Sequence, residues 1–196
     1  ITTPAVAYLT NYYKATMGVV ISASHNPYYD NGIKFFNGNG YKIENKQEKE
    51  IENILINEEY KKINIPGKDI GKVQLLKDAK NIYIEYVIHS INGDFSKNGY
   101  KIIFDCANGA SSNIVGELFN RLNLNFKVIN NRPNGININK KCGSTCTDEL
   151  QNKVLNEHAD LGFAFDGDAD RVLTVDEKGQ MIDGDQMMVI YADSFL

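Results

Sequence analysis

Three aspartates separated by single small residues are the most distinctive pattern in this sequence of 196 residues. Asp166, Asp168 and Asp170 lie in the segment LGFAFDGDADRVLTVD, between two apolar stretches with the pattern of buried strands. In an extended strand the outer two would be about 13 Å apart, at roughly 3.3 Å per residue, so one ion could not contact all three. Gly167 and Ala169 carry little or no side chain, and we expect the backbone to curl there and bring the carboxylates together.

A cluster of carboxylate oxygens is suited to a hard divalent cation. Mg²⁺ is the best fit, at about 2.0 to 2.1 Å from each oxygen, with water or phosphate oxygens completing its shell. Without a cation, three adjacent negative charges would repel one another. We therefore interpret Asp166, Asp168 and Asp170 as a magnesium-binding loop.

Other interpretations of the same segment are an acidic surface turn, an EF-hand loop and a phosphatase of the haloacid dehalogenase type. In an EF-hand, Asp166, Asp168, Asp170 and Glu177 would take positions one, three, five and twelve. Arg171 stands at position six, where that loop needs glycine, and the flanking segments resemble strands rather than helices. A phosphatase would use Asp166 as a nucleophile directly after a buried strand, and this alternative stays open.

A second candidate for chemistry is the segment ISASHNP near the start of the chain. Residues 18–23 have the pattern of a fully buried strand that places Ser24 and His25 at its carboxyl end, where ligands usually bind in open α/β sheets. Phosphate on the Ser24 oxygen would be a natural extra ligand for an ion that three aspartates only partly enclose. The plainer interpretation is that Ser24 satisfies a turn and that His25 is solvated. Lys34 could equally pack at the edge of the core or contact a phosphate.

Composition and charge exclude several classes of protein. A net charge of −4 and a pI near 5.4, with no basic stripe, argue against nucleic-acid binding. No apolar run approaches the roughly 20 residues of a membrane span, and no signal segment opens the sequence. Cys106, Cys142 and Cys146 are too few and too irregular for a disulfide framework, which favours a reducing compartment such as the cytoplasm. Cys142 and Cys146 could be paired metal ligands, but no second pair of Cys or His completes a zinc site.

The elements that must position these residues alternate between strand and helix. Helices are expected at residues 3–15, 47–60, 79–90, 111–122, 147–158 and from 185, and strands at 18–23, 101–105, 126–129 and 161–165. Hairpins are expected to join residues 32–36 with 41–43, and 172–175 with 181–182. We expect Thr3 to cap the first helix, and residues 65–71 to be a linker between domains. Apolar, unbroken strands alternating with helices predict an α/β fold of three α/β/α layers with a mixed, mostly parallel sheet.

Five segments together resemble the α-D-phosphohexomutase superfamily: ISASHNPYYDNGIKFF, DCANGA, PNGININKKCGST, AFDGDADRVLTVDEKG and DGDQ. The segments YYDNGIKFF and PNGININ are similar to those of the bacterial phosphoglucosamine mutase family within this superfamily. The resemblance runs over almost the whole chain and is weakest at residues 47–62 and 74–98. It implies that residues 1–68 are the end of a first domain, 69–184 a second domain with the metal loop, and 185–196 the start of a third.

The resemblance also implies a set of functional residues. Ser24 would be the phosphorylated nucleophile, and its phosphate would bind Mg²⁺ together with Asp166, Asp168 and Asp170. His25, Lys34 and Arg171 would line the active site around the transferring phosphoryl group, where positioning and neutralisation of charge are the main needs. Ala169 stands where many members of the phosphoglucosamine mutase family have glycine, a small change that we expect the loop to tolerate.

The activity implied is intramolecular phosphotransfer on a sugar phosphate, from glucosamine 6-phosphate to glucosamine 1-phosphate through a 1,6-bisphosphate. The product would be a precursor of UDP-N-acetylglucosamine for the cell wall. A phosphomannomutase or phosphoglucomutase would share every residue named above, and a non-catalytic cation-binding module stays open. The sugar-recognition and phosphate-binding loops of the family's third and fourth domains are outside the match, so we expect the isolated chain to be inactive.

Overall fold

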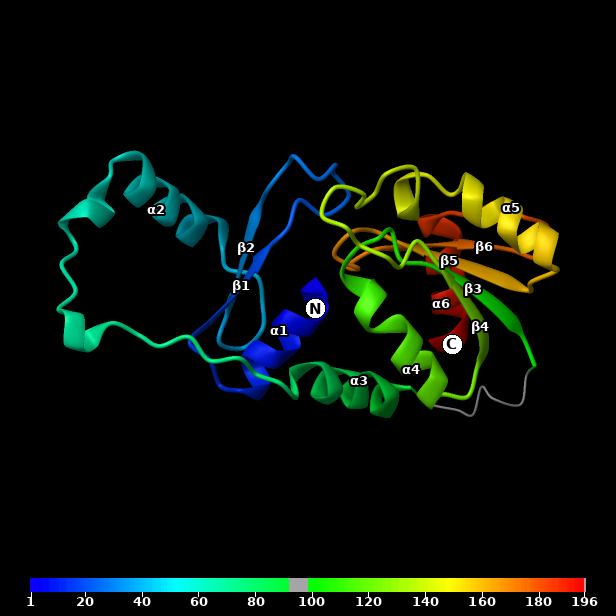
Figure 1. Cartoon of the computed structure of the whole chain (residues 1–196), viewed down its shortest axis with the longest axis horizontal. Coiled ribbons are helices and arrows are strands. Elements are labelled where there is room, and N and C mark those ends of the chain that lie inside the picture. The colour runs from blue at the N-terminus through cyan, green and yellow to red at the C-terminus, as the bar shows by residue number, and fades with distance from the viewer. Residues whose placement is uncertain (92–98, 196) are drawn as a thin grey trace.

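The computed structural model of the chain describes residues 1–91 and 99–195 (Figure 1). The helices are α1 (Thr3–Tyr12), α2 (Asn45–Ile56), α3 (Ala79–Ser90), α4 (Val115–Arg121), α5 (Asp148–Glu157) and α6 (Gly184–Phe195). The strands are β1 (Met17–Ile21), β2 (Ile33–Asn37), β3 (Lys101–Asp105), β4 (Asn125–Ile129), β5 (Leu161–Phe165), β6 (Val172–Val175) and β7 (Met181–Ile182). Among the described residues, no helix combines the length with the apolar character that a membrane span requires.

The larger sheet has five strands in the order β4-β3-β5-β6-β7. β3 pairs in parallel with both β4 and β5, whereas β6 and β7 continue the sheet antiparallel. The predicted hairpin between β6 and β7 is confirmed, with Gly179 in the left-handed region at its turn (φ 73°). The predicted mixed α/β class is therefore confirmed, and the carboxyl ends of β3, β4 and β5 meet at one edge of this sheet.

Both faces of this sheet are covered by helices, which gives the three predicted layers. On one face Leu150 and Val154 of α5 pack against Ile103. Gly162 permits this approach, because a Cβ there would lie 2.9 Å from Val154 Cγ2. On the other face Phe104 stacks on Phe119 of α4, with ring centroids 4.1 Å apart. Ile84 of α3 packs with Ile114 and Leu118 in a separate buried cluster, so α3 adds to the core beside α4.

The smaller sheet contains β1 and β2, paired antiparallel, with α1 packed beside β1. The prediction that the strand after α1 is fully buried is wrong for this chain: Val19 is 49% exposed and Ile21 75% exposed. The reason is that, among the described residues, β1 has β2 as its pairing strand and α1 on one face. The predicted hairpin after β2 is reduced to a single bridge between Phe36 and Lys42.

Some predicted boundaries shift for local reasons. Thr2, not Thr3, caps α1, because its side chain accepts a hydrogen bond from the Ala5 N–H (3.4 Å). The helix predicted at residues 111–122 begins as a 3₁₀ turn (Ala110–Asn113) before α4. Helix α2 ends at Ile56, close to Glu58 in the left-handed region (φ 53°), earlier than predicted.

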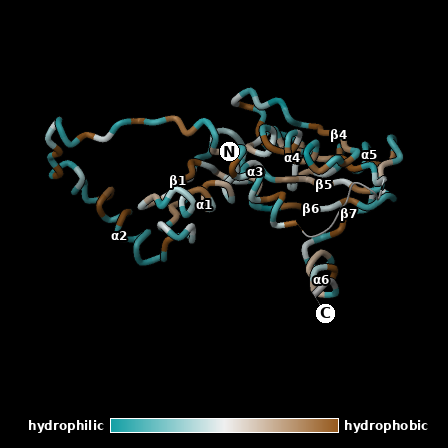
Figure 2. Tube along the Cα trace, turned by 90° about the horizontal axis from the view of Figure 1, so that it is seen from below, coloured by the Kyte–Doolittle hydropathy of each residue, from teal (hydrophilic) through white to brown (hydrophobic). Residues whose placement is uncertain are grey.

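The two sheets lie side by side. The smaller sheet contacts the larger one at the edge where the carboxyl ends of β3, β4 and β5 lie. Tyr8 of α1 stacks on Tyr86 of α3, with ring centroids 3.9 Å apart. Residues 63–78 form an exposed connection with one short 3₁₀ turn at Gly67–Asp69, in the region expected to be a linker. Figure 2 shows α6 projecting away from the larger sheet, at the other side of the molecule from α2.

Candidate functional site

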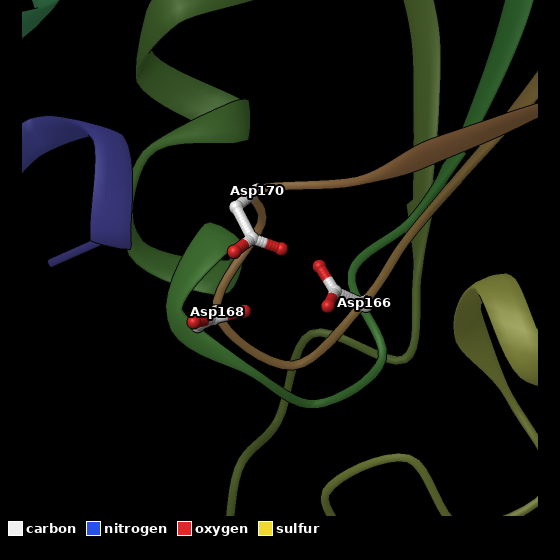
Figure 3. Close-up of side chains that lie close together, drawn as sticks. All are labelled: Asp166, Asp168 and Asp170. Atoms are coloured by element: carbon white, nitrogen blue, oxygen red, sulfur yellow. The ribbon is translucent and has the colours of Figure 1, made fainter. Parts of the chain in front are cut away.

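The aspartate loop, residues 166–170, is the turn between β5 and β6. Its backbone curls as expected: the Ala169 N–H donates to the Asp166 carbonyl (3.1 Å), and Ala169 is left-handed (φ 57°). Asp166, Asp168 and Asp170 each offer one carboxylate oxygen, and these oxygens lie within 4.8 Å of one another. Figure 3 shows the three side chains gathered on this turn. The curl therefore brings together carboxylates that an extended strand would separate.

The environment of Asp168 is suited to a cation. This side chain is buried, and its Oδ1 has no hydrogen-bond partner. Its Oδ2 accepts from Lys34 Nζ and from Thr3 Oγ1, both at 2.6 Å. A buried carboxylate oxygen without a partner is costly, whereas a divalent cation would satisfy it. The three aspartates offer only oxygen ligands, which are the ligands that Mg²⁺ prefers.

Lys34 bridges two carboxylates of the aspartate loop. Its Nζ is 2.6 Å from Asp168 Oδ2 and 2.8 Å from Asp170 Oδ2. Burial opposes the charge of Lys34, but its hydrogen bonds to the two aspartates raise its pKa above the usual value. Burial likewise opposes the charge of Asp168, and the hydrogen bonds from Lys34 and Thr3 outweigh it and lower its pKa. Both groups are therefore held in their charged forms.

Ser24 reaches the aspartate loop from the other sheet. Its Oγ donates to Asp166 Oδ2 (2.6 Å) and accepts from Arg171 Nη2 (2.6 Å). Ser24 is left-handed (φ 56°), a conformation that costs free energy for a residue with a side chain and that is found at functional sites. The Ser22 hydroxyl supports it by accepting from the Ser24 N–H (2.9 Å).

Arg171 links the serine to the fully buried Asp166. Its backbone N–H and its Nε donate to the two oxygens of Asp166, at 3.2 and 3.3 Å. Its Nη2 contacts both Ser24 Oγ and His25 Nδ1. One guanidinium thus sits beside the serine oxygen, with His25 and Asp166 fixing its orientation.

The structure brings together all the residues that the sequence singled out for chemistry, although their roles stay predictions. They are Ser24, His25, Lys34, Asp166, Asp168, Asp170 and Arg171. The EF-hand interpretation is excluded, because strands β5 and β6 flank the loop where helices are required. Asp166 is fully buried and already bonded to Ser24 and Arg171, which leaves it poorly placed as a nucleophile.

Two residues of the site were missed by sequence reasoning. Thr3, expected to be a helix cap, instead donates its hydroxyl to Asp168, and its N–H donates to the Asp168 carbonyl (3.0 Å). Asn139 donates to two carbonyls of the Ser24 segment. Two signals were available for Asn139: its place in PNGININKKCGST, one of the segments that carry the family resemblance, and its position in the loop after β4, at the carboxyl edge of a parallel strand.

The cysteines give no support to a zinc site. Cys106 and Cys142 are buried and Cys146 is partly buried, and in the described part of the chain none of the three belongs to a converging group of three or more possible metal ligands. Across the described part of the chain, the aspartate triad is the one group of three or more acidic, His or Cys side chains that converges as metal ligands would.

The sequence matches one family over most of its length. The family is described as phosphoglucomutase/phosphomannomutase, with alpha/beta/alpha domain I matching residues 1–62 and alpha/beta/alpha domain II matching residues 81–179. Two curated relatives, the phosphoglucosamine mutases of Acetivibrio thermocellus and Clostridium novyi, are each 51% identical over 189 residues, covering 96% of this chain. The match covers 41% of each of these relatives, so the chain spans about two fifths of their length.

Solved structures show the same fold at lower sequence identity. A phosphoglucomutase/phosphomannomutase family protein from Burkholderia thailandensis superimposes with a TM-score of 0.78 at 21% identity, covering 96% of this chain and 42% of that one. Aspergillus fumigatus N-acetylphosphoglucosamine mutase, solved in complex with GlcNAc-6P and magnesium, gives a TM-score of 0.53 at 18% identity. That match covers 93% of this chain and 49% of the fungal one.

Proposed function

Because this chain belongs to the phosphoglucomutase/phosphomannomutase family, we propose that Ser24 is the residue that carries the phosphoryl group in a phosphohexomutase reaction. The observation that carries this proposal is the position of Ser24 Oγ, 2.6 Å from both Asp166 Oδ2 and Arg171 Nη2.

In the same proposal residues 1–68 belong to the family's first domain, 69–184 to its second and 185–196 to its third.

The aspartate loop would hold the metal ion of this centre. Asp166, Asp168 and Asp170 would supply the oxygens, and the ion would give the partnerless Oδ1 of Asp168 a partner. A phosphate on Ser24 would supply a further ligand. Mg²⁺ bound there would neutralise phosphate charge and polarise the phosphoryl oxygens. Lys34, which is bonded to Asp168 and Asp170, would supply a positive charge beside the same phosphate.

The side chains of the chain itself account for much of the transfer. The O1 hydroxyl of the sugar phosphate attacks the phosphorus, the bond from phosphorus to Ser24 Oγ breaks, and the serine oxygen takes up the proton that the sugar releases. Arg171 and Lys34 neutralise the charge on the equatorial oxygens, and His25 and Asp166 keep Arg171 in place. The bisphosphate then reorients, and its 6-phosphate returns to Ser24 by the reverse step.

For the substrate we propose glucosamine 6-phosphate, converted to glucosamine 1-phosphate. Support comes from the curated relatives, since the two quoted above are phosphoglucosamine mutases at 51% identity. A phosphomannomutase or phosphoglucomutase remains the alternative within the enzyme class. Outside it, the alternative is a cation-binding module without catalysis, since the burial of Asp166 and its bonds to Ser24 and Arg171 disfavour a phosphatase that uses Asp166.

The location of phosphate on the protein separates these functions. Peptide mass analysis of the purified full gene product should place phosphate on Ser24, and Ser24→Ala should abolish mutase turnover while leaving the melting temperature nearly unchanged. Ser90→Ala, an exposed serine at the end of α3, is the matched control and should be active. Phosphate on Asp166, or a tenth of the wild-type rate in Ser24→Ala, would remove Ser24 from this role.

A further inference from the structure

The Ser24 loop, residues 22–28, crosses from the smaller sheet to the aspartate loop with few bonds of its own. Its internal support includes the Ser24 N–H on Ser22 Oγ (2.9 Å) and the Asn26 N–H on the Ala23 carbonyl (3.1 Å). Most residues of the loop after Ser24 are exposed. The position of Ser24 therefore depends on contacts from the larger sheet.

Those contacts fall into two kinds. One kind involves the reacting oxygen itself or Arg171, the side chain beside it: Asp166 and Arg171 bond to Ser24 Oγ, and Arg171 contacts His25. The other kind comes from Asn139, whose Nδ2 donates to the Ser24 carbonyl and to the Asn26 carbonyl, each at 2.9 Å. Both amide hydrogens of Asn139 are thus spent on the backbone of the Ser24 loop.

The two kinds differ in what phosphorylation does to them. A phosphate on Oγ removes the hydrogen that Ser24 donates to Asp166, and it presents new oxygens to Arg171. The two backbone carbonyls bound by Asn139 are chemically the same in both states of the serine. On this basis, and resting on the proposed function, we propose that Asn139 is a positioning residue that holds the Ser24 loop against the aspartate loop throughout the phosphoryl-transfer cycle.

Asn139 is itself anchored to the end of the larger sheet. Its N–H donates to the carbonyl of buried Ala107 (2.9 Å). The Ala107 N–H in turn donates to Oδ1 of Asp105, a fully buried carboxylate at the end of β3 (2.9 Å). Asn139 is left-handed (φ 56°), a conformation that asparagine tolerates better than most residues. We call Asn139 and its two hydrogen bonds to the Ser24 loop the clamp. The clamp therefore ties the Ser24 loop to the end of β3.

Close packing leaves the loops little freedom to compensate for a lost clamp. A Cβ on Gly167 would lie 2.5 Å from the Ser24 carbonyl oxygen and 2.8 Å from Asn139 Nδ2. Gly167 of the aspartate loop is thus in close contact with both the Ser24 loop and the side chain of Asn139. Loss of the two hydrogen bonds would let the Ser24 loop move away from this contact, and a small displacement of a reacting group is costly for transfer.

The test separates the side chain of Asn139 from its backbone conformation. Asn139→Gly removes the amide while keeping a residue at ease with a positive φ, and Asn139→Asp keeps the size but replaces the donor by an acceptor. Asn123→Gly is the matched control, because Asn123 is also left-handed (φ 52°) but lies exposed after α4.

In the chain itself, the rate of amide hydrogen exchange at Ser24 and Asn26 measures how firmly Asn139 holds the Ser24 loop. This measurement does not require an active enzyme. We expect both amides to exchange about fivefold faster or more in Asn139→Gly and Asn139→Asp, and to be unchanged in Asn123→Gly. Exchange within twofold of the wild-type rate in both Asn139 variants would overturn the clamp.

In the full gene product, the kinetics of the same variants measure the effect of Asn139 on phosphoryl transfer. We expect kcat to fall about tenfold or more in both Asn139 variants with KM nearly unchanged, and the melting temperature of Asn139→Gly to stay close to that of Asn123→Gly. An unchanged kcat, or a fall fully explained by unfolding, would overturn the positioning role. If Ser24→Ala kept its turnover instead, the proposed function would fail, and the exchange rates would still decide the clamp.

Discussion

Lys34 is the residue whose structural and functional interpretations are hardest to separate, because it already pairs with Asp168 and Asp170. In this arrangement it offsets the repulsion within the aspartate loop. In the proposed reaction the same ammonium would stabilise charge on the phosphoryl group. The two roles predict different responses to removal of the charge.

Lys34→Met tests which role dominates. With Mg²⁺ present to compensate the aspartates, we expect kcat of the full gene product to fall about 100-fold, while the melting temperature falls by only a few degrees. The control is Lys61→Met, which removes an exposed lysine paired with Glu58 (2.6 Å) in the segment after α2 and should change neither value. A large drop in melting temperature with nearly normal kcat would favour the packing role.

Residues with a distinctive chemical type could be found from the sequence, and residues defined by long-range contacts could not. The spacing of Asp166, Asp168 and Asp170 predicted their convergence because small residues separate them. Thr3 and Asn139 carry common polar groups whose partners are more than a hundred residues away in the chain. Nothing local distinguishes such a threonine from a helix cap, or such an asparagine from a turn residue.

At the scale of elements, periodicity located the strands and helices around the larger sheet well. The predicted bounds of β3, β5, β6, β7 and α3 agree with the structure residue by residue. The error lies in the burial of β1, since an apolar, β-branched run shows that a strand is suited to a core but not how many neighbours cover it. Exposed Val19 and Ile21 are the consequence.

Gly167 shows how the elements fix the site, and it gives a prediction at this scale. Gly167→Ala places a Cβ 2.5 Å from the backbone oxygen of Ser24, and the φ of Gly167 is outside the left-handed region, so the clash is the main effect. We expect kcat to fall about tenfold or more, because the Ser24 loop must move away.

The matched control is Gly116→Ala in α4, where an added Cβ meets nothing within 4 Å. This change should raise the free energy of unfolding by about 0.5 to 1 kcal/mol and leave kcat unchanged, since alanine is the better helix former. A normal kcat in Gly167→Ala would show that the contact between the two loops is not needed for transfer.

At the scale of the whole molecule, the site exists only where the two sheets meet. The smaller sheet and its loops supply Ser24, His25 and Lys34, and the larger sheet supplies the aspartates, Arg171 and Asn139. Helix α1 adds to the contact through Thr3 and through the stack of Tyr8 on Tyr86. Binding of an ion shared by Ser24 phosphate and the aspartate loop should therefore couple the two halves of the chain.

Titration of Mg²⁺ by calorimetry tests this central claim most directly. We expect the unphosphorylated chain to bind Mg²⁺ weakly, in about the millimolar range, because the three aspartates only partly enclose the ion. Phosphate on Ser24 should tighten binding about tenfold or more, because it adds roughly −1.5 to −2 of charge and several oxygens. Asp168→Asn should weaken binding about tenfold or more in both states, whereas the exposed control Asp69→Asn should not change it. An unchanged affinity in Asp168→Asn would show that residues 166–170 are only an acidic turn, and would contradict the account.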